Sequence, residues 1–476
     1  MRTFKERKPL PLFENIVITT AAAEGKAMAR IDDLVVFVDN AVPGDVADLQ
    51  LTMKKKNYAE AKAIKFHTYS EERATPMCEH FGVCGGCKWQ HMQYVHQLKY
   101  KHQQVIDNFD RLGKFPYQGL QPIVGAEVTS HYRNKLEFTF TNFRWLDDAD
   151  MLKKKEGYEI PKAELNALGF HIPKKFDKAF HINKCHLQAD PSNGIRNFIY
   201  AYAQENEIPF FDLKFQNGYL RTLMIRTTTL NQVMIVLMVA DDKPEWLTPL
   251  LDAVHMAFPS ITSLQYTINT KRNDSYEGLI VQCHKGNDYI VEQLGNLKFK
   301  ISAKSFFQTN TAQANVLYAI TKDFAGLTGN EVVYDLYTGT GTIANYVADK
   351  ASKVVGVEYV EDAVKDAYVN SDYNKITNTS FFAGDMKDVL NDEFIAIHGK
   401  PDVVITDPPR AGMHADVVNT ILRMQPQKVV YVSCNPATQA RDIALMQELY
   451  TVTRVQPVDM FPHTHHVENV ALLELK

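Results

Sequence analysis

A single cysteine, Cys434, follows the apolar run that starts at Lys428, within the stretch Tyr-Val-Ser-Cys-Asn-Pro. A free cysteine is often a small, buried and inert apolar residue. A cysteine that its neighbours activate is instead a strong nucleophile, which can divide one difficult reaction into two easier covalent steps. The chemistry of Cys434 therefore depends on which groups the fold brings next to it.

Acidic residues follow other apolar runs in the last third of the chain. Asp335, Glu358, Asp385 and Asp407 each stand at the end of a short β-rich run, and helix-length segments separate these runs. This alternation predicts a parallel, doubly wound α/β sheet. Ligands of such sheets bind at the carboxyl ends of the strands. We therefore expect the four acids and Cys434 to line one edge of the sheet.

The segment Asp335-Leu-Tyr-Thr-Gly-Thr-Gly341 is the candidate ligand-binding loop. Its glycines let the backbone approach a ligand closely. Gly339-Thr-Gly-Thr-Ile-Ala344 also fits a relaxed dinucleotide fingerprint, so a nicotinamide-dependent oxidoreductase is one alternative. An acid on the strand, four residues before the first glycine, resembles instead the class I S-adenosylmethionine-dependent methyltransferases. That resemblance implies that the loop lies under the amino-acid part of the methyl donor, with Glu358 at the ribose and Asp385 near the adenine.

The segment Asp407-Pro-Pro-Arg410 resembles a motif in which amino-methyltransferases hold the target amine and an aromatic residue follows the prolines. Arg410 stands at the aromatic position, so an exocyclic amine is a poor fit. A thiol beside a methyl donor points to a carbon that is not nucleophilic by itself, and C5 of uracil is such a carbon. Attack of Cys434 on C6 would activate C5, and a base would then have to remove the C5 proton.

The candidate base lies in the last segment of the chain. Glu468 comes just before the final apolar run. A carboxylate that is partly shielded from water can have a pKa suited to proton abstraction. His463, His465 and His466 are rival bases, although a turn rich in histidine can also shape the backbone or contact RNA phosphate. The sequence therefore favours Glu468 and keeps the histidines as alternatives.

Five motifs occur in the order found in the RNA uracil-5-methyltransferases: Ser-Phe-Phe-Gln-Thr-Asn from Ser305, the glycine loop, Asp-Pro-Pro-Arg, Ser-Cys-Asn-Pro and His-Thr-His-His-Val-Glu. The likeness is to the bacterial 23S ribosomal RNA branch. It implies that Cys434 is the nucleophile and Glu468 the proton acceptor. It implies that S-adenosylmethionine is bound by Gln308, Tyr337, Thr342, Glu358, Asp385 and Asp407. Thr338 stands where the family usually has Cys, and Thr342 stands where it usually has Asn. The resemblance therefore supports the contacts to S-adenosylmethionine less directly than it supports the catalytic pair.

A second group of cysteines lies in the first half of the chain. Cys78, Cys84 and Cys87 are closely spaced, and Cys185 is far downstream. Four such thiols can hold tetrahedral zinc or an iron–sulfur cluster, and their spacing does not choose between the two. The family resemblance implies a 4Fe-4S cluster, in a structural or RNA-orienting role because methyl transfer needs no electron. Cys283 is left unassigned.

The length of 476 residues predicts two or three domains. Short β-rich runs predict a small barrel over residues 1–66, which resembles an RNA-binding TRAM domain. Residues 67–295 are expected to form a mixed α+β central domain with the iron–sulfur cysteines. Residues 296–476 are expected to form the methyltransferase domain. A helical pattern at about 94–125 could pack on that catalytic domain.

The net charge of −4 is unevenly distributed. Residues 1–200 carry 29 Lys and Arg against 24 Asp and Glu, whereas the remainder carries 23 against 32. A basic front half fits a nucleic-acid contact confined to one part of the molecule. No apolar run is long enough to span a bilayer, and the N-terminus has no export signal.

We therefore expect a cytoplasmic monomer that acts on RNA, and not on DNA or a membrane. The predicted substrate is one uridine of 23S ribosomal RNA. The same chemistry on a uridine of the transfer RNA T-loop is an alternative. A non-catalytic RNA-binding or iron–sulfur assembly protein would require Cys434 and Glu468 to be incidental.

Overall fold

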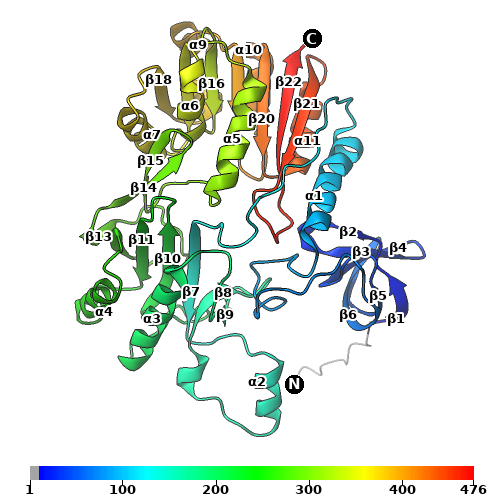
Figure 1. Cartoon of the computed structure of the whole chain (residues 1–476), viewed down its shortest axis with the longest axis vertical. Coiled ribbons are helices and arrows are strands. Elements are labelled where there is room, and N and C mark those ends of the chain that lie inside the picture. Colours follow the sequence, from blue (N-terminus) through cyan, green and yellow to red (C-terminus); the bar gives the residue numbers. More distant parts are fainter. Residues whose placement is uncertain (1–9) are drawn as a thin grey trace, which may run out of the picture.

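The apolar runs of the last third of the chain pair into one seven-stranded sheet with the order β18-β17-β16-β19-β20-β22-β21 (Figure 1). The computed structural model describes residues 10–476. The first five of these strands in the chain are parallel, and β22 lies antiparallel between β20 and β21. The predicted α/β fold is therefore confirmed. The strands are β16 (Val332–Leu336), β17 (Lys353–Glu358), β18 (Thr379–Ala383), β19 (Val403–Thr406), β20 (Lys428–Ser433), β21 (Tyr450–Val458) and β22 (Glu468–Leu475).

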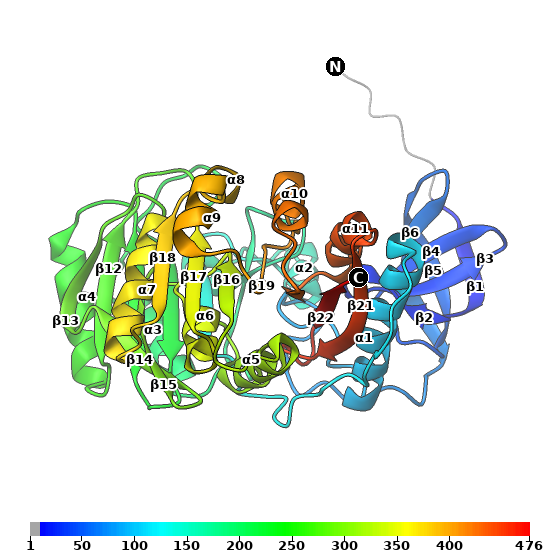
Figure 2. The same cartoon turned by 90° about the horizontal axis from the view of Figure 1, so that it is seen from above.

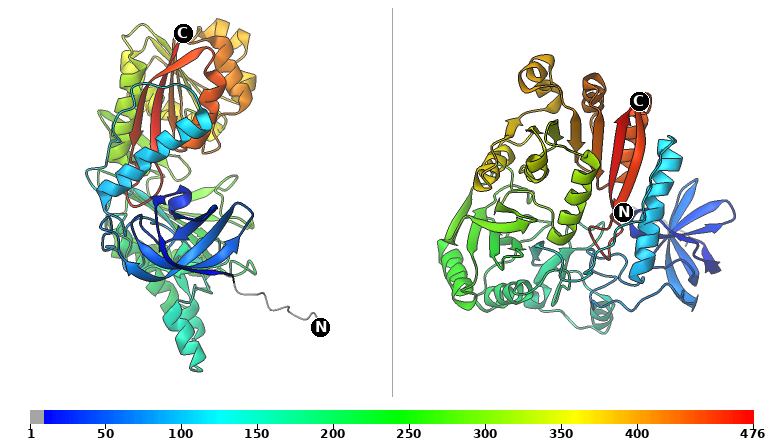
Figure 3. Two further views of the ribbon diagram at one scale, coloured as in Figure 1. Left: turned by 90° about the vertical axis from the view of Figure 1, so that its right-hand side faces the viewer. Right: turned by 45° about the horizontal axis from the view of Figure 1, so that its top comes forward.

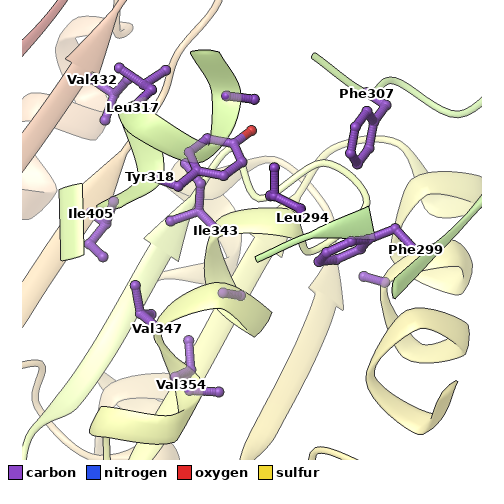
Figure 4. Close-up of a cluster of buried hydrophobic side chains, with 14 of the residues drawn as sticks. Leu294, Phe299, Phe307, Leu317, Tyr318, Ile343, Val347, Val354, Ile405 and Val432 are labelled. Atoms are coloured by element: carbon purple, nitrogen blue, oxygen red, sulfur yellow. The ribbon is translucent and has the colours of Figure 1, made fainter. Parts of the chain in front are cut away.

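Helices cover both faces of this sheet, which explains why its central strands are almost entirely apolar. On one face, Leu317 and Tyr318 of α5 pack with Ile343 of α6 against Ile405 and Val432 of the sheet (Figure 4). α10 and α11 pack on the other face. Nowhere in residues 10–476 does a helix have the length and hydropathy of a bilayer-spanning segment. The helices are α5 (Thr311–Ala325), α6 (Thr342–Val347), α7 (Glu361–Tyr373), α8 (Met386–Val389), α9 (Asp392–His398), α10 (Ala415–Met424) and α11 (Pro436–Met446).

A second seven-stranded sheet, with the order β13-β12-β11-β10-β7-β8-β9, forms the central unit, green in Figure 1. α3 (Ser192–Glu205) and α4 (Pro244–Ala257) pack on it, while α2 (Asp148–Lys155) lies in the connection from β7 to β8. The hairpin of β14 (Tyr289–Leu294) and β15 (Leu297–Ser302) belongs to the same core as α5. The strands are β7 (Lys135–Thr141), β8 (Ala167–His171), β9 (Ala179–His181), β10 (Leu220–Thr227), β11 (Val233–Val239), β12 (Ser263–Ile268) and β13 (Val281–Gly286).

Six strands at the N-terminus curl into a small barrel, with the order β1-β5-β6-β4-β3-β2. Alternate residues point inward, as Val36 and Val38 of β4 and Leu49 and Leu51 of β5 do. The first nine residues, where the predicted barrel and the basic N-terminal segment begin, lie outside the described residues. The strands are β1 (Leu12–Val17), β2 (Thr20–Ala21), β3 (Ala27–Ile31), β4 (Leu34–Asp39), β5 (Val46–Lys54) and β6 (Tyr58–Thr68).

The segment after the cysteine-rich loop packs on the catalytic sheet. α1 (Tyr94–Asn108) continues into one π-helical turn, and residues 117–124 then run parallel to β21. Lys101 of α1 forms a fully buried ion pair with Asp459, with 2.6 Å between Nζ and Oδ1. Figures 2 and 3 show α1 between the barrel and β21. α1 thereby connects the barrel to the edge of the catalytic sheet.

Candidate active site

Cys434 and Glu468 lie at the ends of two neighbouring strands. β20 and β22 are antiparallel, and Ser433 pairs with Asn469 at the end of their ladder. Cys434 is the next residue after β20 and Glu468 is the first residue of β22, so the register places them opposite each other. Cys434 is half-buried, and Glu468 is 4% exposed. The structure thus brings together the two residues that the sequence suggests as nucleophile and base.

A tight turn between β20 and α11 holds Cys434 at this edge. Pro436 begins α11, where the missing N–H costs no hydrogen bond. The Asn435 side chain accepts a hydrogen bond from Ala437 N (3.1 Å) and donates to Arg410 O (3.0 Å). The cap of α11 therefore also holds the Asp-Pro-Pro-Arg segment next to Cys434.

Asp335 is the second-last residue of β16, and Asp407 directly follows the adjacent parallel strand β19, so both lie at the same edge of the sheet. Asp335 is 1% exposed, and its Oδ2 accepts hydrogen bonds from Thr338 Oγ1 (2.5 Å) and Ala344 N (3.0 Å). Its Oδ1 is buried and has no partner among residues 10–476. Asp335 therefore fixes the glycine loop and the first turn of α6, and it leaves one oxygen for a ligand.

Burial makes this acidic edge hold protons near neutral pH. It raises the pKa of Asp335 and of Asp407 to about 7 each, and nearby negative charges add to both shifts. It raises the pKa of Glu468 to about 8, where the Asp407 carboxylate adds to the rise and Arg410 opposes it. A positive ligand would favour the ionised carboxylates. The edge is therefore suited to a cation.

The Cys434 thiol is protonated at neutral pH in this environment. Burial raises its pKa to about 11, the carboxylates of Glu468 and Asp407 add to the rise, and Arg410 opposes it. Reactive cysteines are usually found beside positive charge, which lowers their pKa. Activation of Cys434 therefore requires a bound cation or a change in the charge of its acidic neighbours.

The glycine loop leaves space above it. Tyr337, Gly339 and Gly341 all have positive φ angles, of 63°, 54° and 73°. A Cβ added to Gly341 would lie 2.9 Å from the Cβ of Ala367, whereas one added to Gly339 would meet nothing within 4 Å. Glu358 Oε2 accepts a hydrogen bond from Gly339 N at 3.1 Å. The loop and the end of β17 thus face open space that a ligand can fill.

The remaining predicted ligands of the methyl donor surround this space. Thr342 begins α6 and is buried, and the half-buried Asp385 follows β18 and caps α8. The Gln308 side chain lies beside the hydroxyl of Tyr318. The carbonyl of Phe306 accepts a hydrogen bond from Thr340 of the glycine loop (3.3 Å), which places the Gln308 segment beside that loop. All six predicted ligands therefore gather at one end of the sheet.

The histidine turn before Glu468 is neutral at physiological pH. Burial lowers the pKa of His463 and His465 to about 4 and that of His466 to about 3. His463 faces α1, and His466 Nε2 lies 3.3 Å from Arg410 Nη2. A base is most effective when its pKa is close to the working pH. Glu468 meets that condition better than any of the three histidines.

Tyr318 is a polar group of the site that the sequence did not indicate. It is 4% exposed within the core of α5, and its ring and hydroxyl are visible in Figure 4. Burial and the nearby carboxylates of Asp407, Asp335 and Glu468 raise the pKa of its hydroxyl far above the usual value. Its position on the helix is that of an ordinary core aromatic residue. Only the packing of α5 on the sheet shows where its hydroxyl lies.

Asp459 fixes the turn that carries Glu468, and it too had no signal in the sequence. Its carboxylate accepts hydrogen bonds from Lys101 Nζ (2.6 Å) and Tyr94 Oη (2.9 Å) of α1. Its carbonyl accepts from Gln313 Nε2 of α5 at 2.8 Å. The partners lie hundreds of residues earlier in the chain. Asp459 therefore fastens α1 and α5 to the start of the histidine turn.

The four cysteines that are predicted to bind zinc or an iron–sulfur cluster line one cavity of about 70 Å³ in the central unit. Gly86 N donates a hydrogen bond to Cys84 Sγ at 3.4 Å. The Asn193 side chain of α3 holds Cys185 at the cavity. It accepts a hydrogen bond from Cys185 N (2.8 Å) and donates one to Cys185 O (3.1 Å). The cysteines are Cys78, Cys84, Cys87 and Cys185.

Burial shields these thiols from water, and the guanidinium of Arg133 opposes the resulting rise in pKa at Cys87 and Cys185. Burial raises the pKa of Cys84 to about 12 and that of Cys87 to about 11. The cavity walls include the apolar side chains of Leu136 and Ile182. Within residues 10–476, no three His, Cys, Asp or Glu side chains converge as a single metal ion would require. Cys283 is exposed and lies on β13, away from this cavity.

Comparison with known proteins agrees with these features. Residues 281–476 match the tRNA (Uracil-5-)-methyltransferase family, and residues 15–64 match the TRAM domain. The chain is 54% identical to an uncharacterized RNA methyltransferase of Bacteroides thetaiotaomicron, covering 96% of this chain and 100% of that protein. It is 38% identical to an uncharacterized RNA methyltransferase of Chlorobaculum tepidum, covering 96% and 95%. A nicotinamide-dependent oxidoreductase, which was based on the glycine pattern alone, finds no support in these matches.

One solved structure is similar over nearly the whole chain. It is the Pyrococcus abyssi tRNA (uracil-54, C5)-methyltransferase in complex with S-adenosyl-L-homocysteine. The TM-score is 0.73 at 25% identity, and the match covers 96% of this chain and 99% of that one. The similarity therefore includes the barrel and the central unit as well as the catalytic sheet.

Proposed function

The chain belongs to the S-adenosylmethionine-dependent RNA (uracil-5)-methyltransferases, and we propose that it methylates C5 of a uridine in 23S ribosomal RNA through a covalent bond to Cys434. The observation that carries the proposal is the position of Cys434 opposite Glu468 at the acidic edge of the sheet. A nucleophile, a base and a cation-binding rim are the three groups that this reaction requires.

The proposed chemistry has three steps. The thiolate of Cys434 adds to C6 of the uracil, and the electrons of the C5–C6 double bond move into an enolate. C5 then forms a bond to the methyl group, which the sulfonium of the donor supplies. Glu468 removes the remaining proton from C5, the double bond forms again, and the C6–S bond breaks to release Cys434. The overall products are 5-methyluridine, S-adenosylhomocysteine and one proton.

The acidic edge supports two proton transfers: the loss of the thiol proton of Cys434 and the removal of the proton from C5. A positive sulfonium next to Asp335 and Asp407 would favour their ionised forms, so that their raised pKa values fall when the donor binds. The same positive charge favours the thiolate of Cys434. The sulfonium would favour the ionised form of Glu468 in the same way, and the carboxylate can then accept the proton from C5 and pass it on to water.

The methyl donor would occupy the open space above the glycine loop. Glu358, at the end of β17, would accept hydrogen bonds from the ribose hydroxyls, and Asp385 would lie near the adenine. The Oδ1 atom of Asp335, which has no partner among residues 10–476, would accept a hydrogen bond from S-adenosylmethionine. Gln308, Tyr337, Thr342 and Asp407 would complete the site. Because Gly339 has no side chain, S-adenosylmethionine would have room to approach the backbone of the loop.

We propose a 4Fe-4S cluster at Cys78, Cys84, Cys87 and Cys185. Each thiolate of such a cluster binds a different iron, so the ligands stand further apart than around a single zinc ion. The four thiols that line one cavity support a bound metal or cluster there, and the family resemblance favours the cluster. A bound cluster would supply a rigid crosslink between the loop at residues 78–87 and the start of α3. It takes no part in the methyl transfer.

The choice of 23S ribosomal RNA follows from the family resemblance and not from the architecture. The barrel and central unit fit a long RNA, yet the Pyrococcus abyssi protein that matches them is a transfer RNA enzyme. That protein is the specific reason to keep a transfer RNA uridine as the second candidate substrate. The proposal includes a cytoplasmic monomer, as expected for an enzyme that acts on cellular RNA.

The test is to offer protein-free 23S RNA fragments and unmodified transfer RNA side by side, with labelled methyl donor. Labelled 5-methyluridine should appear in the 23S fragments. Label in the T-loop of transfer RNA instead would overturn the choice of substrate and leave the chemistry intact. Label in neither RNA, with the cluster and donor bound, would contradict the proposed activity.

A further inference from the structure

A groove in the central unit has no part in the methyl transfer proposed above. It has a volume of about 910 Å³ and runs between the cysteine-rich loop, the β8–β9 connection and residues 211–216 and 272–274. Six of its lining residues carry basic side chains: Lys88, His171, Lys174, Lys175, Arg221 and Arg272. Asp274 is the one acidic residue that lines it, and Arg221 pairs with that carboxylate at 2.8 Å. The groove is therefore a concave surface of positive charge.

Aromatic side chains accompany these charges. Phe176, in the β8–β9 connection, lines the groove and is 77% exposed. Phe215 is not a lining residue, but it lies in the chain between the lining residues Leu213 and Gln216 and is 70% exposed. Exposed phenylalanines among lysines are the combination that binds single-stranded nucleic acid, because bases stack on the rings while cations contact the phosphates.

The far wall of the groove is held in a fixed shape. The Arg221 guanidinium is 3% exposed, stands 4.4 Å from the Phe211 ring centroid and donates hydrogen bonds to the carbonyls of Asn269 (2.7 Å) and Lys271 (2.6 Å). Arg221 thereby ties residues 269–274 to β10. A preformed groove binds its ligand at a lower cost in conformational entropy than loops that must first become ordered.

A series of contacts along the histidine turn links the groove to the catalytic site. Lys88 lines one end of it, and Lys88 N donates a hydrogen bond to His463 O at 2.8 Å. The turn that starts at His463 leads to His466, which lies 3.3 Å from Arg410. Arg410 is next to Cys434, whose pKa it lowers. An RNA strand that left the catalytic site along this turn would reach the groove at Lys88.

We propose that this groove binds the single-stranded RNA that flanks the target uridine. The inference rests on the proposed function, because it takes RNA as the substrate. Base stacking on Phe176 and phosphate contacts from Lys175 and Arg272 would hold the flanking segment, while the uridine itself reaches Cys434. Loops with splayed bases are the usual targets of sequence-specific RNA recognition, and a duplex offers no free base to Phe176.

The test compares RNA binding by matched variants. Lys175 and Arg272 form no ion pair within residues 10–476, so Lys175→Glu with Arg272→Glu changes charge without breaking a salt bridge. The control is Lys350→Glu with Lys400→Glu, since these exposed lysines precede β17 and β19 at the opposite end of the catalytic sheet. Binding of fluorescent oligouridylate of 20 nucleotides should weaken at least tenfold in the groove variant only. The slope of log affinity against log salt should fall by about 0.7 for each lost phosphate contact.

Phe176→Ala should weaken the same binding about tenfold, as the loss of one stacked base predicts. The control is Met256→Ala, since Met256 is 81% exposed on α4 and outside the groove. A 20-base-pair RNA duplex should bind more weakly than the single strand and respond less to Phe176→Ala. Equal binding by groove and control variants would overturn the proposal. Competition by polyglutamate as strong as by oligouridylate would do so too, and would point to an acidic protein partner.

Methylation of 23S RNA separates this inference from the proposed function. The groove variants should raise KM for RNA and keep kcat, because saturating RNA restores occupancy of the active site. If the wild-type protein and all variants fail alike to methylate RNA, the proposed function is wrong. If the wild type methylates RNA and the groove variants match it in both KM and oligouridylate affinity, only the groove assignment is wrong.

Discussion

The molecule holds two thiol sites whose cysteines have much in common. Cys434 and the four cysteines of the central cavity are shielded from water, and burial raises the pKa of Cys434, Cys84 and Cys87 to between about 11 and 12. Their surroundings differ. Cys434 faces the carboxylates of Glu468 and Asp407 and the guanidinium of Arg410, whereas Cys87 and Cys185 of the cavity lie near one another and near the guanidinium of Arg133.

This difference shows that a raised pKa does not by itself identify a catalytic thiol. Charges that a ligand can change surround Cys434, so its protonation can follow substrate binding. Near the cavity, Arg133 and Arg196 are permanently positive and lower the pKa of Cys185, and a bound metal would hold the thiols as thiolates. The charged partners of a cysteine, and not its pKa alone, separate a nucleophile from a ligand.

The largest effect should come from Cys434, the thiol that we propose as the nucleophile. Cys434→Ala should lower the rate of methylation by more than about a thousandfold, or about 4 kcal/mol of barrier, because no other group can bond to C6. The affinity for S-adenosylmethionine should change little. Single-turnover assays with labelled donor measure the first quantity, and calorimetry measures the second. Cys283→Ala, which removes an exposed thiol elsewhere, is the control. Residual activity within about tenfold of wild type would exclude Cys434 as the nucleophile.

The next effect should come from the proposed base. Glu468→Gln should permit attack and methyl transfer but slow the release of product, because the amide cannot accept the C5 proton. Turnover should fall by about a hundredfold or more, and a protein–RNA adduct should accumulate as a retarded band on a denaturing gel. Glu474→Gln on the same strand is the matched control. Normal turnover without an adduct would transfer the role of base to His463 or His465.

Substitution of the cavity cysteines should change the iron and sulfide content and the thermal stability of the protein more than the rate of methyl transfer. Anaerobically purified protein should be brown and contain iron and sulfide, and Cys84→Ser or Cys87→Ser should lose both and melt several degrees lower. The physical reason is that a cluster that binds only the folded state stabilises it. Metal analysis and thermal melting measure these effects, with Cys283→Ser as the control. Stoichiometric zinc without iron would replace the cluster by a structural zinc site.

The smallest effect should be a pH dependence of stability at the acidic edge. Burial raises the pKa of Glu468 from 4.5 to about 8, so the folded state keeps a proton that the unfolded state gives up above about pH 4.5. This contribution to stability is complete below pH 4.5 and is lost as pH rises towards 8. Glu468→Gln removes the titration and should stabilise the ligand-free protein by about 1–3 kcal/mol at pH 8 and by less at pH 5.

Thermal melting of the wild type, Glu468→Gln and Glu474→Gln at both pH values measures that difference. Glu474 lies on the same strand, so its substitution controls for the loss of a carboxylate from β22. An equal gain at both pH values would mean that packing and not titration is responsible. A loss at pH 8 would show that the Glu468 carboxylate has a stabilising partner in the folded protein.

The sequence by itself determined the strands of the catalytic sheet and the residues at their ends. Apolar runs and the helix-length segments between them are local features, and they predicted the carboxyl ends of β16 to β20 to within two residues. The chemical types at the strand ends, with their order along the chain, indicated the family. The same local patterns indicated the barrel, because alternation along a strand shows which side chains point inward.

Only the tertiary structure decided which strand lies next to which. β22 inserts between β20 and β21, and this non-sequential pairing, which no local pattern encodes, puts Glu468 opposite Cys434. The buried pair of Lys101 and Asp459, the hydroxyl of Tyr318 among the acids and the entry of Cys185 into its cavity depend on the same kind of long-range contact. The reason is physical: the period of a pattern fixes the face of an element, whereas packing between distant segments fixes its neighbours.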